Sequence, residues 1–415
     1  MKNAKGCLYL TYDGLSDPLG RSQILPYLER FAAKGISLTV VSFEKAKELS
    51  SCRRRLAQNG IRWIPLRYHK RPPVLSTCFD LLCGIFVCTW FSFRRPPRLV
   101  HARSFVAALL ALWVKRVTHA RFLYDVRGFW PEERVEGGLT RPNGFLYRCT
   151  KWWEARFFRA ADGMVVLSQA AKDLLESRLG GNGRLVPITV IPTCTDLDAF
   201  APAEAPNPTD LTRIVYVGSV GTWYLMEEMV RFFQELRLRI PAAFLTILTP
   251  RPDPILMHAL RGLDQSSYDI RMVAHEEVPQ NLRTMHVSLC FIKLVESKKA
   301  SCPTKVGESL ACGIPVVITR GVGDCDTLIE RERVGVVVSD LTAQGYQQTI
   351  ERLVALTREG KALRERCRRV AQDYFDLERG VERYLSFYEL LLAGETKGLV
   401  QKKKGVDFRV SVSKV

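Results

Sequence analysis

Apolar residues follow two patterns along the chain, and these patterns alternate. Short runs such as Cys7–Thr11, Arg98–Arg103 and Arg213–Val217 predict strands. Between such runs apolar residues recur every three or four positions, as between Ser22 and Gly35, which predicts amphipathic helices. Strands that alternate with helices are typical of an α/β fold with parallel sheets.

The alternation is interrupted once and then restarts. The 415-residue chain is too long for one ordinary core, and a Pro-rich segment at 201–208 precedes the strand that begins at Arg213. The sequence therefore predicts two Rossmann-like, doubly wound domains that face each other across a cleft. The expected parts are a first domain at 1–195, a second at 196–372, a helix at 373–393 that packs back on the first domain, and a flexible basic tail at 394–415.

One helix-to-strand unit of the second domain, Ser301–Asp326, has small and polar residues at both ends. Pro303 pre-sets the backbone for a helix start, and Gly313 ends that helix before a short buried strand. Anionic ligands bind at such places in α/β sheets, because helix amides point at them. The unit is therefore either a ligand site or an ordinary part of the core.

Charged residues gather where two strands of the first domain end. One predicted strand ends at His101–Arg103, and the next ends at Arg127 and leads into a loop, Gly128–Arg134. The loop also holds Trp130. Ligands bind outside the carboxyl ends of strands in open α/β sheets. The residues alone leave a binding site and a solvated loop equally open.

The charge balance points to an anionic partner. The chain has 61 Lys and Arg against 43 Asp and Glu, a net charge of +18. Such a charge suits a nucleoside diphosphate, an anionic lipid or a nucleic acid. Its 12 cysteines form no CxxC pair and have no histidine at zinc-finger spacing. We therefore expect no metal site and no disulfide framework, with reduced thiols in the cytoplasm.

An apolar stretch at 74–93 is about long enough to cross a bilayer. Asp80 lies inside it, and basic pairs flank it at Lys70–Arg71 and Arg94–Arg95. We expect a buried or membrane-grazing helix in preference to a span. The flanking charges, together with Arg53–Arg55, suit either docking on an anionic membrane or an ordinary solvated surface.

Motifs along nearly the whole chain resemble those of the family-4 glycosyltransferases, which are retaining enzymes of GT-B fold that use nucleotide sugars. The motifs that carry the resemblance are Asp13–Gly20, Asp125–Trp130, Val190–Pro192, Tyr216–Ser219, Pro303–Glu308, Leu310–Val317 and Val381–Tyr384. The resemblance implies an acceptor site on the first domain and a nucleotide-sugar site on the second.

For the donor, the resemblance implies a site at the start of the helix that follows Ser301. Helix amides there would hold the diphosphate, Lys305 would neutralise a phosphate oxygen, and Glu308 would accept hydrogen bonds from the ribose. The expected donor-binding residues are Gly20, Gly218, Ser219, Thr222, Lys293, Ser301, Thr304, Lys305 and Glu308.

For catalysis, the sequence departs from the family pattern at Arg127, where many members have a histidine. A guanidinium is no general base at pH 7, so we expect Arg127 to bind a phosphate while a carboxylate or His101 carries protons. The expected catalytic residues are Asp125, Arg127, Glu133 and His101.

Two further departures concern the donor. Ala300 stands where many members have a carboxylate, and Glu296 lies nearby without a sign that it replaces that group. Ser219 stands where many relatives have an arginine, so Lys293 and Lys298 are candidates to supply the missing charge.

The resemblance implies a metal-independent hexosyltransferase that needs no cofactor and takes a UDP- or GDP-sugar as its substrate. We expect a polyprenyl-linked or other glycan acceptor, a role in polysaccharide biosynthesis, and a cytoplasmic enzyme that is peripheral on the inner face of the cell membrane. One alternative is a nucleotide-sugar 2-epimerase of the same fold, for which no acid–base set is visible. Another is a nucleic-acid-binding protein, which rests on net charge alone; we expect no nucleic acid partner.

Overall fold

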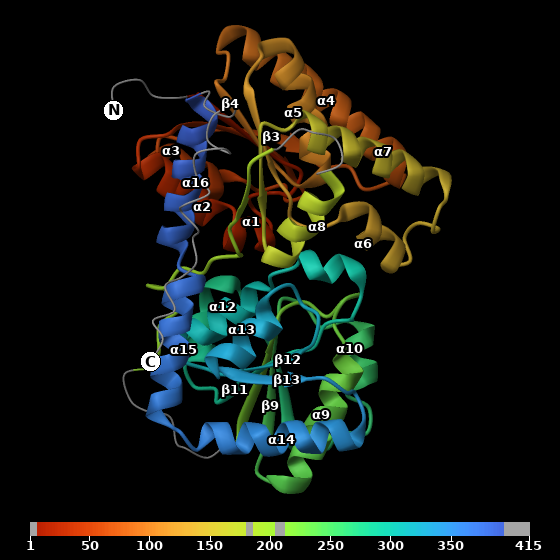
Figure 1. Ribbon diagram of the computed structural model, residues 1–415, viewed down its shortest axis with the longest axis vertical. Coiled ribbons are helices and arrows are strands. Elements are labelled where there is room, and N and C mark those ends of the chain that lie inside the picture. Colours follow the sequence, from red (N-terminus) through yellow and green to blue (C-terminus); the bar gives the residue numbers. More distant parts are fainter. Residues whose placement is uncertain (1–5, 180–185, 204–211, 394–415) are drawn as a thin grey trace.

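The computed structural model describes residues 6–179, 186–203 and 212–393. Two α/β domains lie one above the other along the long axis of the molecule, as Figure 1 shows. Each contains one parallel sheet, which confirms the expected fold of two Rossmann-like domains. The predicted basic tail at 394–415 lies outside the described residues.

The first domain is built on a seven-stranded parallel sheet in the order β3-β2-β1-β4-β5-β6-β7. Its strands are β1 (Gly6–Thr11), β2 (Ser37–Glu44), β3 (Arg62–Arg67), β4 (Leu99–Arg103), β5 (Arg121–Asp125), β6 (Gly163–Val166) and β7 (Ile188–Val190). Its helices are α1 (Pro18–Gln23), α2 (Leu25–Ala33), α3 (Ser50–Gln58), α4 (Pro73–Arg94), α5 (Ser104–Thr118), α6 (Trp130–Glu136), α7 (Phe145–Ala160) and α8 (Gln169–Leu179).

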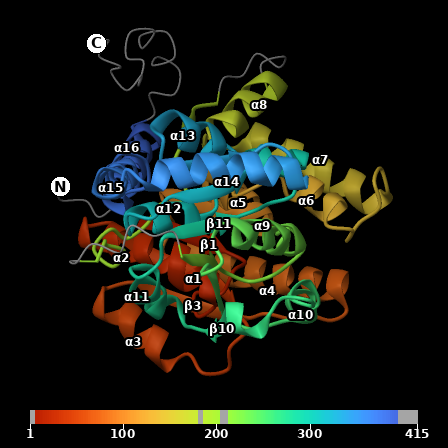
Figure 2. The ribbon, with the colours of Figure 1, turned by 90° about the horizontal axis from the view of Figure 1, so that it is seen from below.

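The second domain is built on a six-stranded parallel sheet in the order β10-β9-β8-β11-β12-β13. Its strands are β8 (Arg213–Val217), β9 (Phe244–Thr249), β10 (Tyr268–Met272), β11 (Val287–Cys290), β12 (Val316–Thr319) and β13 (Gly335–Val338). Its α-helices are α9 (Met226–Arg239), α10 (Pro254–Ala259), α11 (Val278–Leu282), α12 (Thr304–Ala311), α13 (Cys325–Glu332), α14 (Ala343–Thr357) and α15 (Lys361–Tyr374). Short 3₁₀ turns are η2 (Gln265–Ser267), η3 (His275–Glu277) and η4 (Glu296–Ala300). Seen from below in Figure 2, α9 lies beside α14, which it contacts.

The last described helix, α16 (Leu377–Leu392), leaves the second domain and packs against α2 of the first. Tyr388 on α16 contacts the ring of Phe31 on α2, with 5.6 Å between ring centroids. Gly163 at the start of β6 allows this approach, because an added Cβ would lie 2.7 Å from the ring of Phe387. The helix therefore covers one face of the first sheet.

The structure adds elements that the sequence did not predict. Gly128–Arg134 was expected as a loop, but residues 130–136 form α6, in which Pro131 and two glutamates of the first turn favour a helix start. β3 contains Pro65 and was not expected as a strand. It lies at the edge of the sheet, where proline costs no ladder hydrogen bond.

Candidate active site

The best-placed charged group of the second domain is Lys305, in the first turn of α12. Its side chain is buried, and its Nζ lies 4.1 Å from the ring centre of Tyr216 and 3.8 Å from that of Tyr224. Among the described residues, Nζ has no hydrogen-bond partner. Burial lowers the pKa of Lys305 to about 8, although Cys290 and Glu308 act in the opposite direction. This ammonium is therefore positioned for an anion that the protein itself does not supply.

The turn after β8 leaves room for this ammonium. Gly218 has φ +124°, a conformation that side chains rarely adopt, and an added Cβ would lie 3.3 Å from Nζ of Lys305. Ser219 and Thr222 of the same turn are exposed, and the backbone carbonyl of Ser219 accepts a hydrogen bond from the Tyr216 hydroxyl. Of the predicted residues of this turn, Gly218 lies against Lys305.

Glu308 lies one turn further along α12 and is also buried. Its Oε1 lies 3.0 Å from Nε2 of His275. Burial alone would lower the pKa of His275, but Glu308 reverses this and raises it. Glu308 and His275 line a pocket of about 230 Å³ between the domains, to which Arg21 and Ser22 of α1 contribute from the other side. Sequence reasoning found Glu308 but missed His275, which carries no motif.

On the interpretation that Glu308 accepts hydrogen bonds from a ribose, which the resemblance implies, we expect Glu308→Ala to raise the Kd for a nucleotide donor about tenfold, equivalent to ~1.4 kcal/mol. Titration calorimetry with a nucleoside diphosphate measures the change. His275→Ala serves as the matched control, since it removes the partner of Glu308 but leaves the carboxylate in place. Equal affinities for wild type and Glu308→Ala would remove Glu308 from the donor site.

A polar chain crosses the cleft from the first domain to the start of α12. Gln23, the last residue of α1, donates through Nε2 to Oγ1 of Thr304 at 2.7 Å. Its Oε1 accepts from Nη2 of Arg103 at 2.8 Å and from Nη2 of Arg127 at 3.3 Å. Arg127 also donates to Oγ1 of Thr193 at 3.3 Å. Gln23 and Arg103 were not predicted, because only the fold brings the end of α1 beside two strand ends.

Asp125 and His101 lie beneath these arginines and are both buried. Burial alone would raise the pKa of Asp125, but Arg127, His101 and Arg103 together lower it to about 2. Burial lowers the pKa of His101, whose Nδ1 lies 2.6 Å from the hydroxyl of Tyr388. A permanently ionised carboxylate and a buried neutral imidazole are poor proton carriers, so their placement argues for a role in holding the arginines.

Arg127 faces Asp125 at 3.7 Å between Nη1 and Oδ1. We expect Arg127→Ala to lower the free energy of unfolding by up to about 2–3 kcal/mol at pH 7, because it removes one of the charge partners that lower the pKa of the buried Asp125 carboxylate. The paired Asp125 stabilises the fold above its ordinary pKa, and this contribution is lost as the pH falls from 3.8 to about 2. The difference from wild type should therefore shrink in that range.

Arg127→Lys is the control, because it keeps the charge but loses the forked guanidinium. Denaturant unfolding reports stability, and turnover measured well below the melting temperature reports function. Arg127→Ala should also turn over more slowly than wild type. Full turnover by folded Arg127→Ala protein would place this residue outside the functional site.

A second bridge between the domains joins α6 to η4. Glu133 Oε1 accepts from Nζ of Lys298 at 2.9 Å, and Glu136 accepts from the backbone amide of Ser297 at 3.3 Å. Nζ of Lys298 also lies 4.0 Å from the ring centre of Trp223. Lys298 was a candidate to supply the missing phosphate charge, and it is paired with Glu133 in this arrangement. Glu133, predicted as catalytic, lies at the interface with 27% of its side chain exposed.

The remaining predicted donor residues are Gly20, Lys293 and Ser301, and each has a different local environment. Gly20 is inside α1, where an added Cβ would lie 2.0 Å from the carbonyl oxygen of Gly14, so the packing of its own loop explains the glycine. Lys293 is half-buried, and its backbone amide donates to Trp223. The carbonyl of Ser301 contacts Gly323, which has φ +55°.

Ala300 is buried and belongs to the apolar cluster of the first domain, although it lies in the second. Glu296 is about half exposed and forms an ion pair with Lys299, with 2.8 Å between Oε2 and Nζ. At the position where many members of the family have a carboxylate, this chain thus has the methyl group of Ala300, which packs at the contact between the two domains. Glu296 does not replace that carboxylate there, because it pairs with Lys299.

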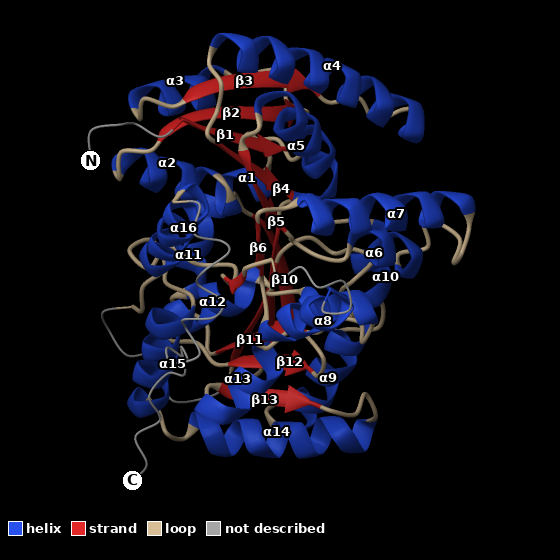
Figure 3. Ribbon diagram, turned by 45° about the horizontal axis from the view of Figure 1, so that its top comes forward, coloured by secondary structure: helices blue, strands red, loops and turns tan. Residues whose placement is uncertain are grey.

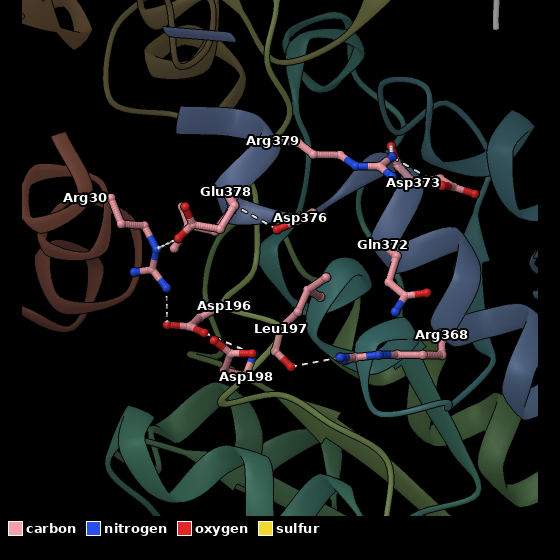
Figure 4. A pocket seen from close by; sticks show the side chains of 11 residues that line it. Arg30, Asp196, Leu197, Asp198, Arg368, Gln372, Asp373, Asp376, Glu378 and Arg379 are labelled. Carbon is pink, nitrogen blue, oxygen red and sulfur yellow. Dashed lines mark hydrogen bonds and ion pairs between the residues drawn. The ribbon is translucent and has the colours of Figure 1, made fainter. Parts of the chain in front are cut away.

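A separate charged cavity of about 400 Å³ lies where the chain passes between the domains, and Figure 4 shows its lining. Arg30 of α2 pairs there with Asp196 and with Glu378 of α16. Thr195 and Asp376 form a parallel bridge between the two crossing segments. Because these charged groups pair with one another, we interpret this cavity as part of the connection between the domains and not as a ligand site.

Comparisons with known proteins match both domains. Residues 21–194 match the family described as "Glycosyl transferase 4-like domain", and residues 212–355 match that described as "Glycosyl transferases group 1". No curated protein sequence shows significant similarity to the chain.

Solved structures share the fold over almost the whole chain. Sucrose-phosphate synthase from Thermosynechococcus elongatus superposes with a TM-score of 0.73 at 17% identity, covering 94% of this chain and 100% of that one. A glycosyltransferase from Rickettsia africae gives 0.68 at 16% identity, covering 94% and 99%. Anabaena Alr3699/HepE, solved with UDP and glucose, gives 0.67 at 13% identity, covering 93% and 100%.

Proposed function

The chain belongs to the glycosyltransferases of GT-B fold that combine a glycosyl transferase 4-like domain with a group 1 domain. We propose that it transfers a hexose from a nucleoside-diphosphate sugar to an alcohol acceptor. The observation that carries the proposal is Lys305, a buried ammonium at the start of α12 that lacks a hydrogen-bond partner among the described residues. HepE, a structural neighbour, was solved with UDP-glucose, which supports a donor of the UDP type, and GDP is the second choice to test.

In the proposed reaction the donor diphosphate lies at the start of α12. Lys305 and the positive end of the helix dipole stabilise the charge that develops as the nucleotide leaves. Glu308 holds the ribose. The acceptor hydroxyl attacks from the side that the diphosphate leaves, and the departing phosphate takes its proton, so the anomeric configuration is retained. This route requires no protein base, which agrees with the buried positions of Asp125 and His101.

The proposed acceptor is a polyprenyl-linked glycan of surface polysaccharide assembly. Arg103 and Arg127 support this choice, because they place two guanidinium groups at the carboxyl end of the first sheet, facing the cleft. A lipid diphosphate is the kind of anion that paired arginines bind. The reaction would then take place in the cytoplasm at the inner face of the cell membrane.

Transfer assays with purified protein test the proposal. UDP- and GDP-hexoses are screened first by thermal stabilisation, and the best donor is then incubated with a polyprenyl-diphosphate sugar. We expect product in which NMR shows the donor's anomeric configuration, undiminished by EDTA. An inverted product would exclude retention, and loss of activity in EDTA that Mg²⁺ restores would exclude metal independence. Conversion of the nucleotide sugar without an acceptor would instead indicate an epimerase.

A further inference from the structure

Helix α4 presents an apolar stripe to solvent along its whole length. Six of its exposed apolar side chains recur every three or four positions, which places them on one face of the helix. They are Leu75 (69% exposed), Phe79 (53%), Leu82 (65%), Phe86 (73%), Trp90 (52%) and Phe93 (78%). A stripe of this size on a free surface is costly in water and marks an interaction site. We propose that α4 lies flat on an anionic lipid bilayer and inserts this stripe between the headgroups.

The charges around α4 favour lipid over other apolar partners. Lys70 and Arg71 precede the helix, Arg94 is its last residue, and Arg95 and Arg98 follow it. All five are exposed. Within the described residues none of them forms an ion pair. Asp80 is the helix's one acidic residue, and it is buried. The charged residues that α4 and its flanking segments expose are therefore all positive, which suits anionic headgroups.

Aromatic residues reinforce this match. The guanidinium of Arg94 lies 4.3 Å from the ring centre of Trp90, so cation and aromatic ring are presented together. Trp113 of α5 extends the surface, with 39% of the residue exposed and its Nε1 donating to Oγ1 of Thr89 on α4. Tryptophan is enriched at the headgroup level of membranes because its ring is amphipathic.

The opposite face of α4 holds the helix to the protein and argues against a span. Asp80 accepts from the hydroxyl of Tyr12 at 2.8 Å and from the amide of His69 at 3.1 Å. Cys88 is fully buried, and Gly84 lets α4 approach Leu110 of α5, since an added Cβ would lie 3.0 Å from its methyl groups. A helix that crossed the bilayer would lose all these contacts and place Asp80 in hydrocarbon.

The position of α4 would allow a membrane-bound acceptor to reach the cleft. Figures 1 and 3 show α4 on the side of the first domain that faces away from the second. It follows β3, whose carboxyl end lies on the cleft side of the sheet, so Leu75 and the start of α4 lie nearer the cleft than Phe93 does. This link to a lipid acceptor rests on the proposed function, whereas the docking of α4 does not.

Sedimentation with vesicles tests the docking. We expect the wild-type protein to bind vesicles with about 30 mol % phosphatidylglycerol at least tenfold more strongly than vesicles of phosphatidylcholine alone, and less strongly as salt increases. Leu82→Glu with Phe86→Glu should weaken binding to the anionic vesicles at least about tenfold, because two carboxylates would enter the headgroup region. Leu238→Glu, at an equally exposed position (78%) on α9 of the second domain, should bind like the wild type.

Three results would overturn the proposal. The first is equal vesicle binding by the double variant and the wild type, and the second is vesicle binding that resists both high salt and alkaline carbonate. The third is a wild-type protein that forms a dimer and does not bind vesicles, with a double variant that is monomeric. The second would indicate a span, and the third a second copy of this chain as the occupant. Hydrolysis of the nucleotide sugar in the absence of vesicles should be the same in the double variant as in the wild type. Loss of hydrolysis would indicate a failure of the proposed donor chemistry, whereas unchanged vesicle binding in the double variant would indicate a failure of the proposed docking.

Discussion

Replacing Lys305 by methionine is expected to remove most of the transfer activity and to stabilise the fold. The two effects have one cause. The ammonium is buried with no hydrogen-bond partner among the described residues, so it is poorly solvated until a diphosphate arrives. Methionine fills a similar volume without the charge. We expect kcat to fall about 10²–10³-fold, a range typical for the loss of one electrostatic group that acts on the transition state.

The stability gain depends on pH in a defined direction. The pKa of Lys305 is lowered from 10.5 to about 8, so at neutral pH the charged form is less favourable in the folded than in the unfolded protein. Lys305→Met should therefore raise the free energy of unfolding at pH 7, by about 1 kcal/mol, because the ~3 kcal/mol cost of the lowered pKa is partly offset by ~2 kcal/mol from the cation–π contacts with Tyr216 and Tyr224. This advantage should shrink as the pH rises from about 8 to 10.5, because the folded wild-type protein loses the proton first. Donor affinity of the wild type should fall over the start of the same range.

Denaturant unfolding at several pH values and donor titration measure both effects. Lys361→Met is the matched control, because the side chain of Lys361 is 85% exposed, and it should change neither quantity. A Lys305→Met protein that is less stable than the wild type at pH 7 would show that the contacts of the ammonium with Tyr216 and Tyr224 outweigh the cost of its burial. A variant that keeps wild-type turnover would remove Lys305 from the donor site and with it the main support for the proposed function.

Restoring the family carboxylate by Ala300→Glu is expected to damage the protein and not to improve it. Ala300 is 2% exposed and packs into the apolar cluster of the first domain. A glutamate there must either stay buried, at a cost of about 3 kcal/mol or more, or force η4 away from the first domain. We expect a lower melting temperature, a larger radius of gyration in solution scattering, and slower transfer.

Ala300→Ser is the control for this variant, since serine is small enough to remain at the domain contact. It should retain nearly the wild-type melting temperature. If Ala300→Glu instead keeps its stability and binds the donor sugar more tightly, the carboxylate reaches the sugar. The methyl group of Ala300 would then lie in an open part of the cleft and not at a packed contact.

The sequence determined the class of the fold because hydrophobic periodicity is a local property of the chain. Alternating strand and helix patterns, and a restart at Arg213, were sufficient to predict two parallel α/β domains. The motif around Lys305 and Glu308 was also recognisable, because both residues lie on one helix at helical spacing. Elements with weak patterns were missed: α3 is strongly basic and buries only Cys52 and Leu56.

The tertiary structure decided which residues far apart in the sequence meet, both across the cleft and where α16 packs on the first domain. Gln23 and Thr304 are 281 positions apart, and His101 and Tyr388 are 287 apart, so no local pattern could pair them. Burial and pairing were equally invisible in the sequence: Lys305 and Lys298 are both buried, but Lys298 pairs with Glu133, whereas Lys305 has no hydrogen-bond partner among the described residues. The sequence thus specified the chemical groups through local spacing. The packing of the domains set their solvation and charge partners, and these determine what each group can do.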